Sequence, residues 1–322
     1  MATHTYRLAS YADSNDAPRA GIIVDDWMID VSDALQRTGH APLASSGAAV
    51  LGVLGRWSDM HPHLQAIAHS ARRGEGRVLT APLSAAQLLP PVLYPGTIFC
   101  AGANYRDHVE EMTKALNLPV EADPHELGLK PWHFIKASAS CVRGSGAHIA
   151  LPGYSKCVDW EAEIAVIIGR ECRNVCIENA LQYVAGVSIV NDLSARDHLR
   201  RQGVAVDSPF HFDWVSQKSF DGALPFGPWM VPLDQIKDIG KLAIRLWVND
   251  ELMQDSSSSN LIFTVAEQIA HLSTRLTLWP GDVIATGTPA GCGAARGRFL
   301  QAGDRVSIWV EDIGVLVNEF TS

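Results

Sequence analysis

The chain has 322 residues and a mass of 34.9 kDa, which is enough for one large domain or for a medium domain with a smaller one. Hydrophobic residues make up 47% and charged residues 19%, which is typical of an ordinary folded protein and excludes a disordered or fibrous one. The formal net charge is −9 and no stripe of Lys and Arg follows the sequence, which argues against a nucleic-acid partner.

Targeting and redox signals are weak. Residues 1–16 show no basic region followed by an apolar core, so we expect neither a secretory signal nor a transit peptide. The longest apolar runs, such as residues 164–168, are far shorter than the roughly 18 to 20 residues of a membrane span. The six cysteines form no CxxC pair, so neither a zinc knuckle nor a disulfide framework is indicated. We therefore expect a cytoplasmic protein.

The first third of the chain predicts a small β-rich domain. Short strand-like runs alternate up to about residue 35, with Asp25 and Asp26 as a hairpin turn. Residues 41–78 are rich in Ala and Gly and have helical stretches, and we expect His61 and His63 there to be a solvated pair near a helix start. Pro90 and Pro91 then stiffen the chain as a linker would. We place an N-terminal domain at 1–91 and a larger domain at 92–322.

Beyond residue 95, strands rich in Val, Ile and Trp dominate. They are expected at 159–169, 184–192, 242–248, 283–286, 305–310 and 315–320, the last two joined by a hairpin at 312–314. One helix begins near Thr264, whose hydroxyl can cap the first turn while Glu267 reaches back. Helices do not alternate regularly with strands, so we predict the α+β class, with a mixed β-roll or barrel-like larger domain.

Acidic residues open one of these strands. Side chains alternate along a strand, so Glu161 and Glu163 point to the same face, about 7 Å apart along the backbone. At 4 Å and an effective dielectric of 20 two such charges repel by about 4 kcal/mol. A divalent cation, a shared proton or an Arg or Lys partner would each offset that repulsion.

A third carboxylate has to come from another strand. Asp192 ends the run 187–191 and could reach the mouth of a neighbouring strand. Glu161, Glu163 and Asp192 would then suit a hard cation such as Mg²⁺ or Mn²⁺ and leave coordination positions open. The alternative is a solvated strand edge followed by a turn.

Two further segments carry possible site residues. His108 lies three residues before Glu111, on one helix face, where a carboxylate can orient an imidazole that acts as a general base; an exposed helix can show the same spacing. The loop 285–293 contains Gly287 and Thr288, whose backbone and hydroxyl can bind a small carboxylate or oxyanion; the alternative is a plain glycine-rich turn. No GxSxG nucleophile elbow is present.

Taken in order, five motifs resemble the fumarylacetoacetate hydrolase family. They are GANYRDHVEEM at 102–112, VDWEAEIAVIIG at 158–169, NDLSARD at 191–197, QKSFDGALPFGPW at 217–229 and TLWPGDVIATGTPAGCG at 277–293. The match spans roughly residues 90–322, and the first 90 residues look like the small N-terminal domain that many bacterial members carry.

The resemblance implies a mixed β-roll, a homodimer, and an Mg²⁺ or Mn²⁺ site at Glu161, Glu163 and Asp192. It also implies roles for other residues. In its terms His108, Glu111 and Lys218 are catalytic, and the residues that bind substrate are Tyr105, Arg196, Gly287 and Thr288.

The sequence departs from the family at two places. Leu199 stands where a glutamine often follows the NDxSARD motif, so the polar contact of that glutamine is missing or comes from His198, Arg200 or Gln202. Residues 113–133 look like a lid that varies among relatives, and Lys136 just after it either touches substrate or caps a strand.

The leading hypothesis is a metal-dependent hydrolase that cleaves a carbon–carbon bond in an acylpyruvate or related β-diketo acid, in aromatic or sugar-acid catabolism. A second keeps the same chemistry but makes the reaction isomerisation, tautomerisation or decarboxylation of a 2-oxo acid such as oxaloacetate or 2-hydroxyhepta-2,4-diene-1,7-dioate. A third is a non-catalytic, metal-stabilised dimer that binds a small carboxylate.

Overall fold

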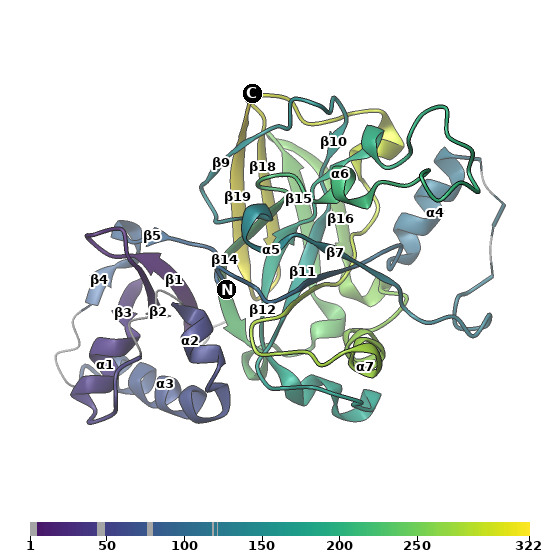
Figure 1. Cartoon of the computed structure of the whole chain (residues 1–322). Coiled ribbons are helices and arrows are strands. Elements are labelled where there is room, and N and C mark those ends of the chain that lie inside the picture. The colour runs from purple at the N-terminus through teal and green to yellow at the C-terminus, as the bar shows by residue number, and fades with distance from the viewer. Residues whose placement is uncertain (1–4, 44–48, 76–79, 118, 121) are drawn as a thin grey trace.

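The computed structural model describes residues 5–43, 49–75, 80–117, 119–120 and 122–322. Figure 1 shows the elements of the first 90 residues beside a larger body of sheets and helices. Parts of two expected segments, the helical region at 41–78 and the lid at 113–133, fall in the gaps between these ranges and lie outside the described residues.

The N-terminal elements are a small sheet with helices on it. Its strands are β1 (Arg7–Ala12), β2 (Pro18–Val24), β3 (Trp27–Asp30), β4 (Thr80–Pro82) and β5 (Gln87–Leu88), and its helices are α1 (Val31–Arg37), α2 (Val50–Leu54) and α3 (Trp57–Arg72). The hairpin expected at Asp25 is confirmed, because Val24 pairs with Trp27 and Asp25 adopts a positive φ of 52°. Such tight two-residue turns require positive φ.

This small sheet is continuous with the larger body. Leu8 of β1 pairs with Met230 of β14 (Leu224–Pro232), so the strand ladder runs through both parts of the chain. The Tyr6 hydroxyl lies 2.6 Å from His61 Nδ1, and His61 Nε2 lies 3.0 Å from Asp234 Oδ2. The prediction of a solvated His61 is therefore wrong, because its partners come from distant segments. The domain boundary near residue 91 stays a prediction.

The main sheet has the order β4-β3-β2-β1-β14-β12-β11-β17-β6-β7. Its strands beyond the N-terminal part are β6 (Ile98–Ala101), β7 (His133–Lys136), β11 (Ala162–Ile168), β12 (Val184–Asn191), β14 and β17 (Val283–Ala285), with β8 (Val142–Arg143) beside β14. Every residue of β11 and β12 is buried, so both faces of the sheet are covered here. Charges at the ends of these strands therefore lie in a low-dielectric environment.

A second sheet has the order β16-β15-β18-β19-β9. Its strands are β9 (His148–Ala150), β15 (Ala243–Val248), β16 (Glu251–Ser257), β18 (Arg305–Val310) and β19 (Gly314–Thr321), and β10 (Val158–Asp159) pairs separately with β13 (Ser194–Ala195). The hairpin expected at 312–314 is confirmed, with Val310 paired to Gly314. The sheets are not closed, so the α+β class is confirmed and the barrel-like alternative is not realised.

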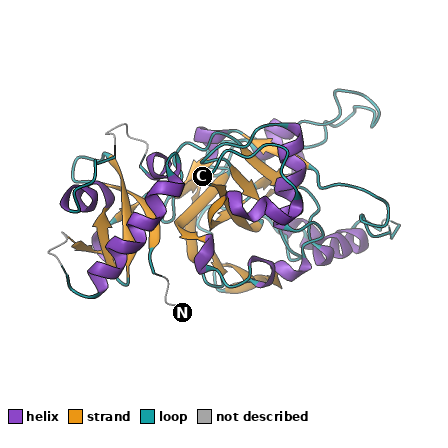
Figure 2. Cartoon of the chain, turned by 90° about the horizontal axis from the view of Figure 1, so that it is seen from below, coloured by secondary structure: helices purple, strands orange, loops and turns teal. Residues whose placement is uncertain are grey.

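The α-helices described beyond residue 95 are α4 (Arg106–Ala115), α5 (Ser138–Cys141), α6 (Trp214–Lys218) and α7 (Val265–Arg275). Figure 2 shows helices lying around the strands of the larger body. The capping box predicted for α7 is confirmed: Thr264 accepts the Glu267 amide, and the Glu267 carboxylate accepts the Thr264 amide. In the lid segment, His125 Nε2 lies 3.0 Å from Glu267 Oε1, which ties the loop to α7.

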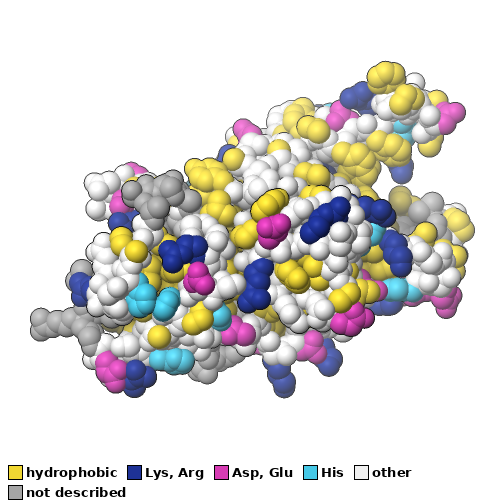
Figure 3. Space-filling model, turned by 60° about the horizontal axis from the view of Figure 1, so that its bottom comes forward, with side chains coloured by type: hydrophobic (Ala, Val, Ile, Leu, Met, Phe, Trp, Pro, Cys, Tyr) yellow, Lys and Arg dark blue, Asp and Glu magenta, His cyan; other side chains and the backbone are white. Residues whose placement is uncertain are grey.

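Surface charge and helix length agree with the composition. On the face drawn in Figure 3, Lys and Arg are interspersed with Asp and Glu and form no continuous basic stripe. Among the described residues, no helix combines the length and the apolar character that crossing a membrane requires.

Candidate active site

Three buried carboxylates meet at the ends of two neighbouring strands. Strands β11 and β12 run antiparallel with Ala162 opposite Asn191, and this register places Asp192 beside Glu161, whose carbonyl accepts the Asp192 amide at 2.9 Å. Glu163 follows two residues on and points to the same side. One carboxylate oxygen from each of Glu161, Glu163 and Asp192 lies within 4.8 Å of the others. The structure thus brings together the three acids that the sequence singled out.

Two of these acids have cationic partners. Lys218 Nζ donates to Glu161 Oε2 at 2.9 Å and to Asp192 Oδ2 at 2.8 Å, and Arg196 also donates to Glu161. Lys136 Nζ donates to Asp192 and to the Leu193 carbonyl. Burial raises the pKa of Glu161, but the charges of Lys218 and Arg196 outweigh burial and hold that pKa below its ordinary value. An Arg or Lys partner, one of the three compensations expected from the sequence, is therefore present for Glu161.

Glu163 is different, because among the described residues it forms no ion pair. Its Oε2 accepts the Gly287 amide at 2.7 Å, and only 1% of the residue is exposed. Burial, followed by the charges of Asp192 and Glu161, raises the pKa of Glu163 well above its ordinary value. A buried carboxylate without an ion-pair partner is costly, so the donor set fits a divalent cation that would bind all three acids.

His108 lies in the same pocket but not in the contact expected for it. Its Nδ1 lies 3.9 Å from Cys292 Sγ, while Glu111 Oε2 accepts the Gly291 amide at 2.7 Å. The described hydrogen bonds include none between His108 and Glu111, so the carboxylate acts on the imidazole only through its charge. Burial lowers the pKa of His108, which keeps the ring neutral and able to accept a proton.

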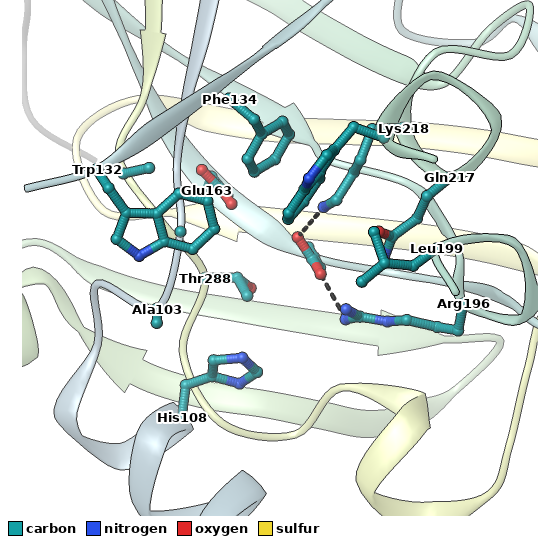
Figure 4. Close-up of a pocket in the computed structure, with 14 residues that line it drawn as sticks. Ala103, His108, Trp132, Phe134, Glu163, Arg196, Leu199, Gln217, Lys218 and Thr288 are labelled. Carbon is teal, nitrogen blue, oxygen red and sulfur yellow. Dashed lines mark hydrogen bonds and ion pairs between the residues drawn. The ribbon is translucent and has the colours of Figure 1, made fainter. Parts of the chain in front are cut away.

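A pocket of about 160 Å³ connects these groups (Figure 4). Its lining residues are Ala101, Gly102, Ala103, His108, Trp132, Phe134, Glu161, Glu163, Arg196, Leu199, Trp214, Gln217, Lys218 and Thr288. The Thr288 hydroxyl accepts from Gln254 Nε2 at 2.9 Å, so its own proton can be donated to a ligand. Gly287 is not a lining residue, and its contact with the site is the hydrogen bond from its amide to Glu163. Tyr105 is fully buried outside the lining, and burial raises the pKa of its phenol.

Sequence reasoning missed several residues of this site. Asp159 accepts from Arg196 Nε at 2.9 Å, and Trp132, Phe134 and Trp214 form an aromatic wall. The sequence allows two roles for Lys136, and the structure shows it fully buried against Asp192. A buried lysine needs a carboxylate partner, but the sequence alone does not say which one.

The fold and the carboxylate cluster together indicate an α+β enzyme with a divalent-metal site beside a small pocket. The chain belongs to the fumarylacetoacetate hydrolase family, because residues 97–321 match the family model described as fumarylacetoacetate (FAA) hydrolase C-terminal.

Several named relatives support this membership. The chain is 36% identical to mitochondrial oxaloacetate tautomerase FAHD2B of Homo sapiens, over 74% of this chain and 70% of that protein. The solved maleylpyruvate hydrolase of Sphingobium sp. SYK-6, in complex with manganese(II) and pyruvate, is 26% identical with a TM-score of 0.73 over 98% of both chains. The fumarylacetoacetate hydrolase of Exiguobacterium antarcticum is 29% identical with a TM-score of 0.74, over 98% of this chain and 99% of that one.

Proposed function

We propose that this protein is a divalent-metal-dependent hydrolase that cleaves the carbon–carbon bond of an acylpyruvate or a related β-diketo acid. The observation that carries the proposal is the unpaired, buried Glu163 between Glu161 and Asp192, in one pocket with a neutral His108. The Mn²⁺ and pyruvate of the related maleylpyruvate hydrolase support both the ion and the type of product.

Glu161, Glu163 and Asp192 would hold Mg²⁺ or Mn²⁺. When bound, such an ion stabilises negative charge that develops on the oxygens of a 2-oxo acid. Carboxylate and carbonyl oxygens are the ligands that these ions prefer, and three protein oxygens leave room for substrate.

The chain's own residues supply orientation and proton transfer. The Thr288 hydroxyl donates a hydrogen bond to the substrate carboxylate. Lys218 and Arg196 place positive charge beside the carbonyl oxygens. His108 takes a proton from water, and the hydroxyl adds to the acyl carbon. The electron pair of the broken bond remains on the pyruvate carbon, which then accepts a proton, so the products are a carboxylic acid and pyruvate. Acid–base help of this kind contributes about 10² to 10⁴ in rate.

A second candidate is tautomerisation, isomerisation or decarboxylation of a 2-oxo acid. The related oxaloacetate tautomerase favours it, and so does the position of Glu111, which is bound to Gly291 N rather than to His108. Keto–enol exchange needs only one proton acceptor near the pocket, whereas hydrolysis also needs an activated water.

The test separates metal dependence from reaction type. Protein stripped with a chelator should lose turnover of acylpyruvates and regain it with Mg²⁺ or Mn²⁺; full turnover without metal contradicts the proposal. If His108→Ala abolishes hydrolysis but leaves enol–keto exchange of oxaloacetate intact, hydrolysis is the native reaction. If the wild type catalyses enol–keto exchange of acylpyruvates and of oxaloacetate but hydrolyses neither, the second candidate replaces the first.

The finer expectations belong to the same proposal. A homodimer is expected, and light scattering coupled to size-exclusion chromatography measures it directly. A cytoplasmic location and a role in aromatic catabolism are expected as well.

A further inference from the structure

One side of the pocket is an aromatic wall, which we define as Trp132, Phe134 and Trp214. The ring centroids of Phe134 and Trp214 are 5.2 Å apart and stacked, and Trp132 meets Trp214 edge-on at 5.8 Å. Figure 4 shows Trp132 and Phe134 on either side of the Glu163 carboxylate, with Leu199 across the cavity from Trp132. The wall therefore faces whatever part of a substrate extends beyond the acid cluster.

The rings of the wall are partly exposed, so a ligand in the pocket can cover them. Trp132 is 47% exposed and Trp214 is 38% exposed although both line the pocket. The backbone of Gly102 leaves room for the Trp132 ring, because a Cβ atom there would lie 1.9 Å from Trp132 Cζ2. Large aromatic rings that line a cavity bind planar or apolar groups, and the area they bury supplies most of the affinity.

The cations of the site leave no positive charge to pair with a second carboxylate of the substrate. The carboxylates beside the pocket are Asp159, Glu161, Glu163 and Asp192, and the cations are Lys136, Arg196 and Lys218. All three cations already donate to these carboxylates. A divalent ion would give the cluster one surplus positive charge, which is fewer than the two negative charges of an enolised 2-oxo acid. A further carboxylate on the substrate would be uncompensated in a largely buried site.

The polar group beside the wall is neutral. Gln217 lines the pocket, is only 2% exposed, and its buried Oε1 has no hydrogen-bond partner among the described residues. Buried amide groups are nearly always hydrogen-bonded, so this one is available to a ligand. As an acceptor, this oxygen can bind a hydroxyl or another N–H or O–H donor of a ligand.

We propose that the substrate is a 2-oxo acid whose distal group is neutral and apolar, preferably aromatic, stacked on Trp132, Phe134 and Trp214 and hydrogen-bonded by Gln217. This assignment rests on the proposed function, because it takes the acid cluster as the place where the 2-oxo acid end binds. It names the substrate class within that function: monocarboxylates with an aryl or alkyl tail, rather than dicarboxylates.

The experiment compares two probes that lack a cleavable bond, 2-oxo-4-phenylbutanoate and 2-oxoadipate, by titration calorimetry on the full chain with Mg²⁺. We expect the phenyl compound to bind at least tenfold more tightly. Trp214→Ala should reduce that preference to about threefold or less, whereas Trp279→Ala, which removes an exposed tryptophan outside the pocket, should leave it unchanged. Equal or tighter binding of 2-oxoadipate to the wild type overturns the assignment.

A gain-of-function variant tests the charge argument separately. Leu199→Arg adds a cation across the cavity from the wall, and we expect it to tighten 2-oxoadipate binding at least tenfold; no gain contradicts the charge argument. Pyruvate serves as the tail-free probe. If pyruvate binds with Mg²⁺ but the phenyl tail adds nothing, the tail assignment fails while the proposed function stands. If neither pyruvate nor any other 2-oxo acid binds, both fail.

Discussion

Replacing Glu163 by glutamine should stabilise the metal-free protein while it abolishes metal binding. The carboxylate lies within 4.8 Å of Glu161 and Asp192 and forms no ion pair among the described residues, so the charge of Lys218 offsets the raised pKa only in part. At that separation and an effective dielectric of 20, each like-charge pair costs about 3 to 4 kcal/mol. Protonation of Glu163 relieves part of the cost, so we expect a net gain of ~2 kcal/mol for Glu163→Gln. Glutamine keeps an oxygen that can accept the Gly287 amide.

The assay is thermal unfolding in chelator and in Mn²⁺, with calorimetric titration of Mn²⁺. In chelator the melting temperature should rise by roughly 4 °C. In Mn²⁺ the order should reverse, because only the wild type gains stability from binding. Glu251→Gln, at an exposed carboxylate paired with Arg298, is the matched control and should change neither quantity. A Glu163→Gln protein that melts lower in chelator, or that binds Mn²⁺ as the wild type does, would refute the reasoning.

The remaining predictions concern three other positions. Burial lowers the pKa of His133 to about 4, so on acidification the unfolded chain binds a proton at a higher pH than the folded chain does. The free energy of unfolding should therefore fall by about 2 kcal/mol as the pH drops from about 6.5 to 4. In urea unfolding, His133→Leu should show a smaller decrease of this free energy over the same pH range. His61→Ala leaves the buried Tyr6 hydroxyl unpaired and should cost about 1 to 3 kcal/mol in urea, whereas His63→Ala should change stability by less than about 0.5 kcal/mol. Gly102→Ala displaces the Trp132 ring and should lower kcat/KM for an aryl substrate several-fold, and an unchanged value would contradict the packing.

The acid cluster could be predicted because strand geometry is local and periodic. Alternation along one strand places Glu161 and Glu163 on one side, and the antiparallel register of β11 and β12 brings Asp192 beside them. The capping box of α7 could be predicted for the same reason, since Thr264 and Glu267 are three residues apart. Local patterns of this kind depend on few distant contacts.

The contacts that failed to follow from the sequence are those where distant groups compete. Helical spacing favours a pair between His108 and Glu111, but the backbone amide of Gly291 takes the carboxylate. Asp59 is the carboxylate nearest to His61 in sequence, yet the partner is Asp234, 173 positions away. Neither competitor is visible in a local window, so tertiary packing overrides the pattern.

The five-residue helix α6 has a consequence for how substrates are discriminated. This short helix carries Trp214 at one end and Lys218 at the other, so a shift of the helix would displace both the pocket-lining ring and the ammonium beside the acids. A tail that fails to seat against the ring therefore also leaves the ammonium displaced from the reacting oxygens. Poor substrates should accordingly have a lower turnover number as well as a weaker affinity.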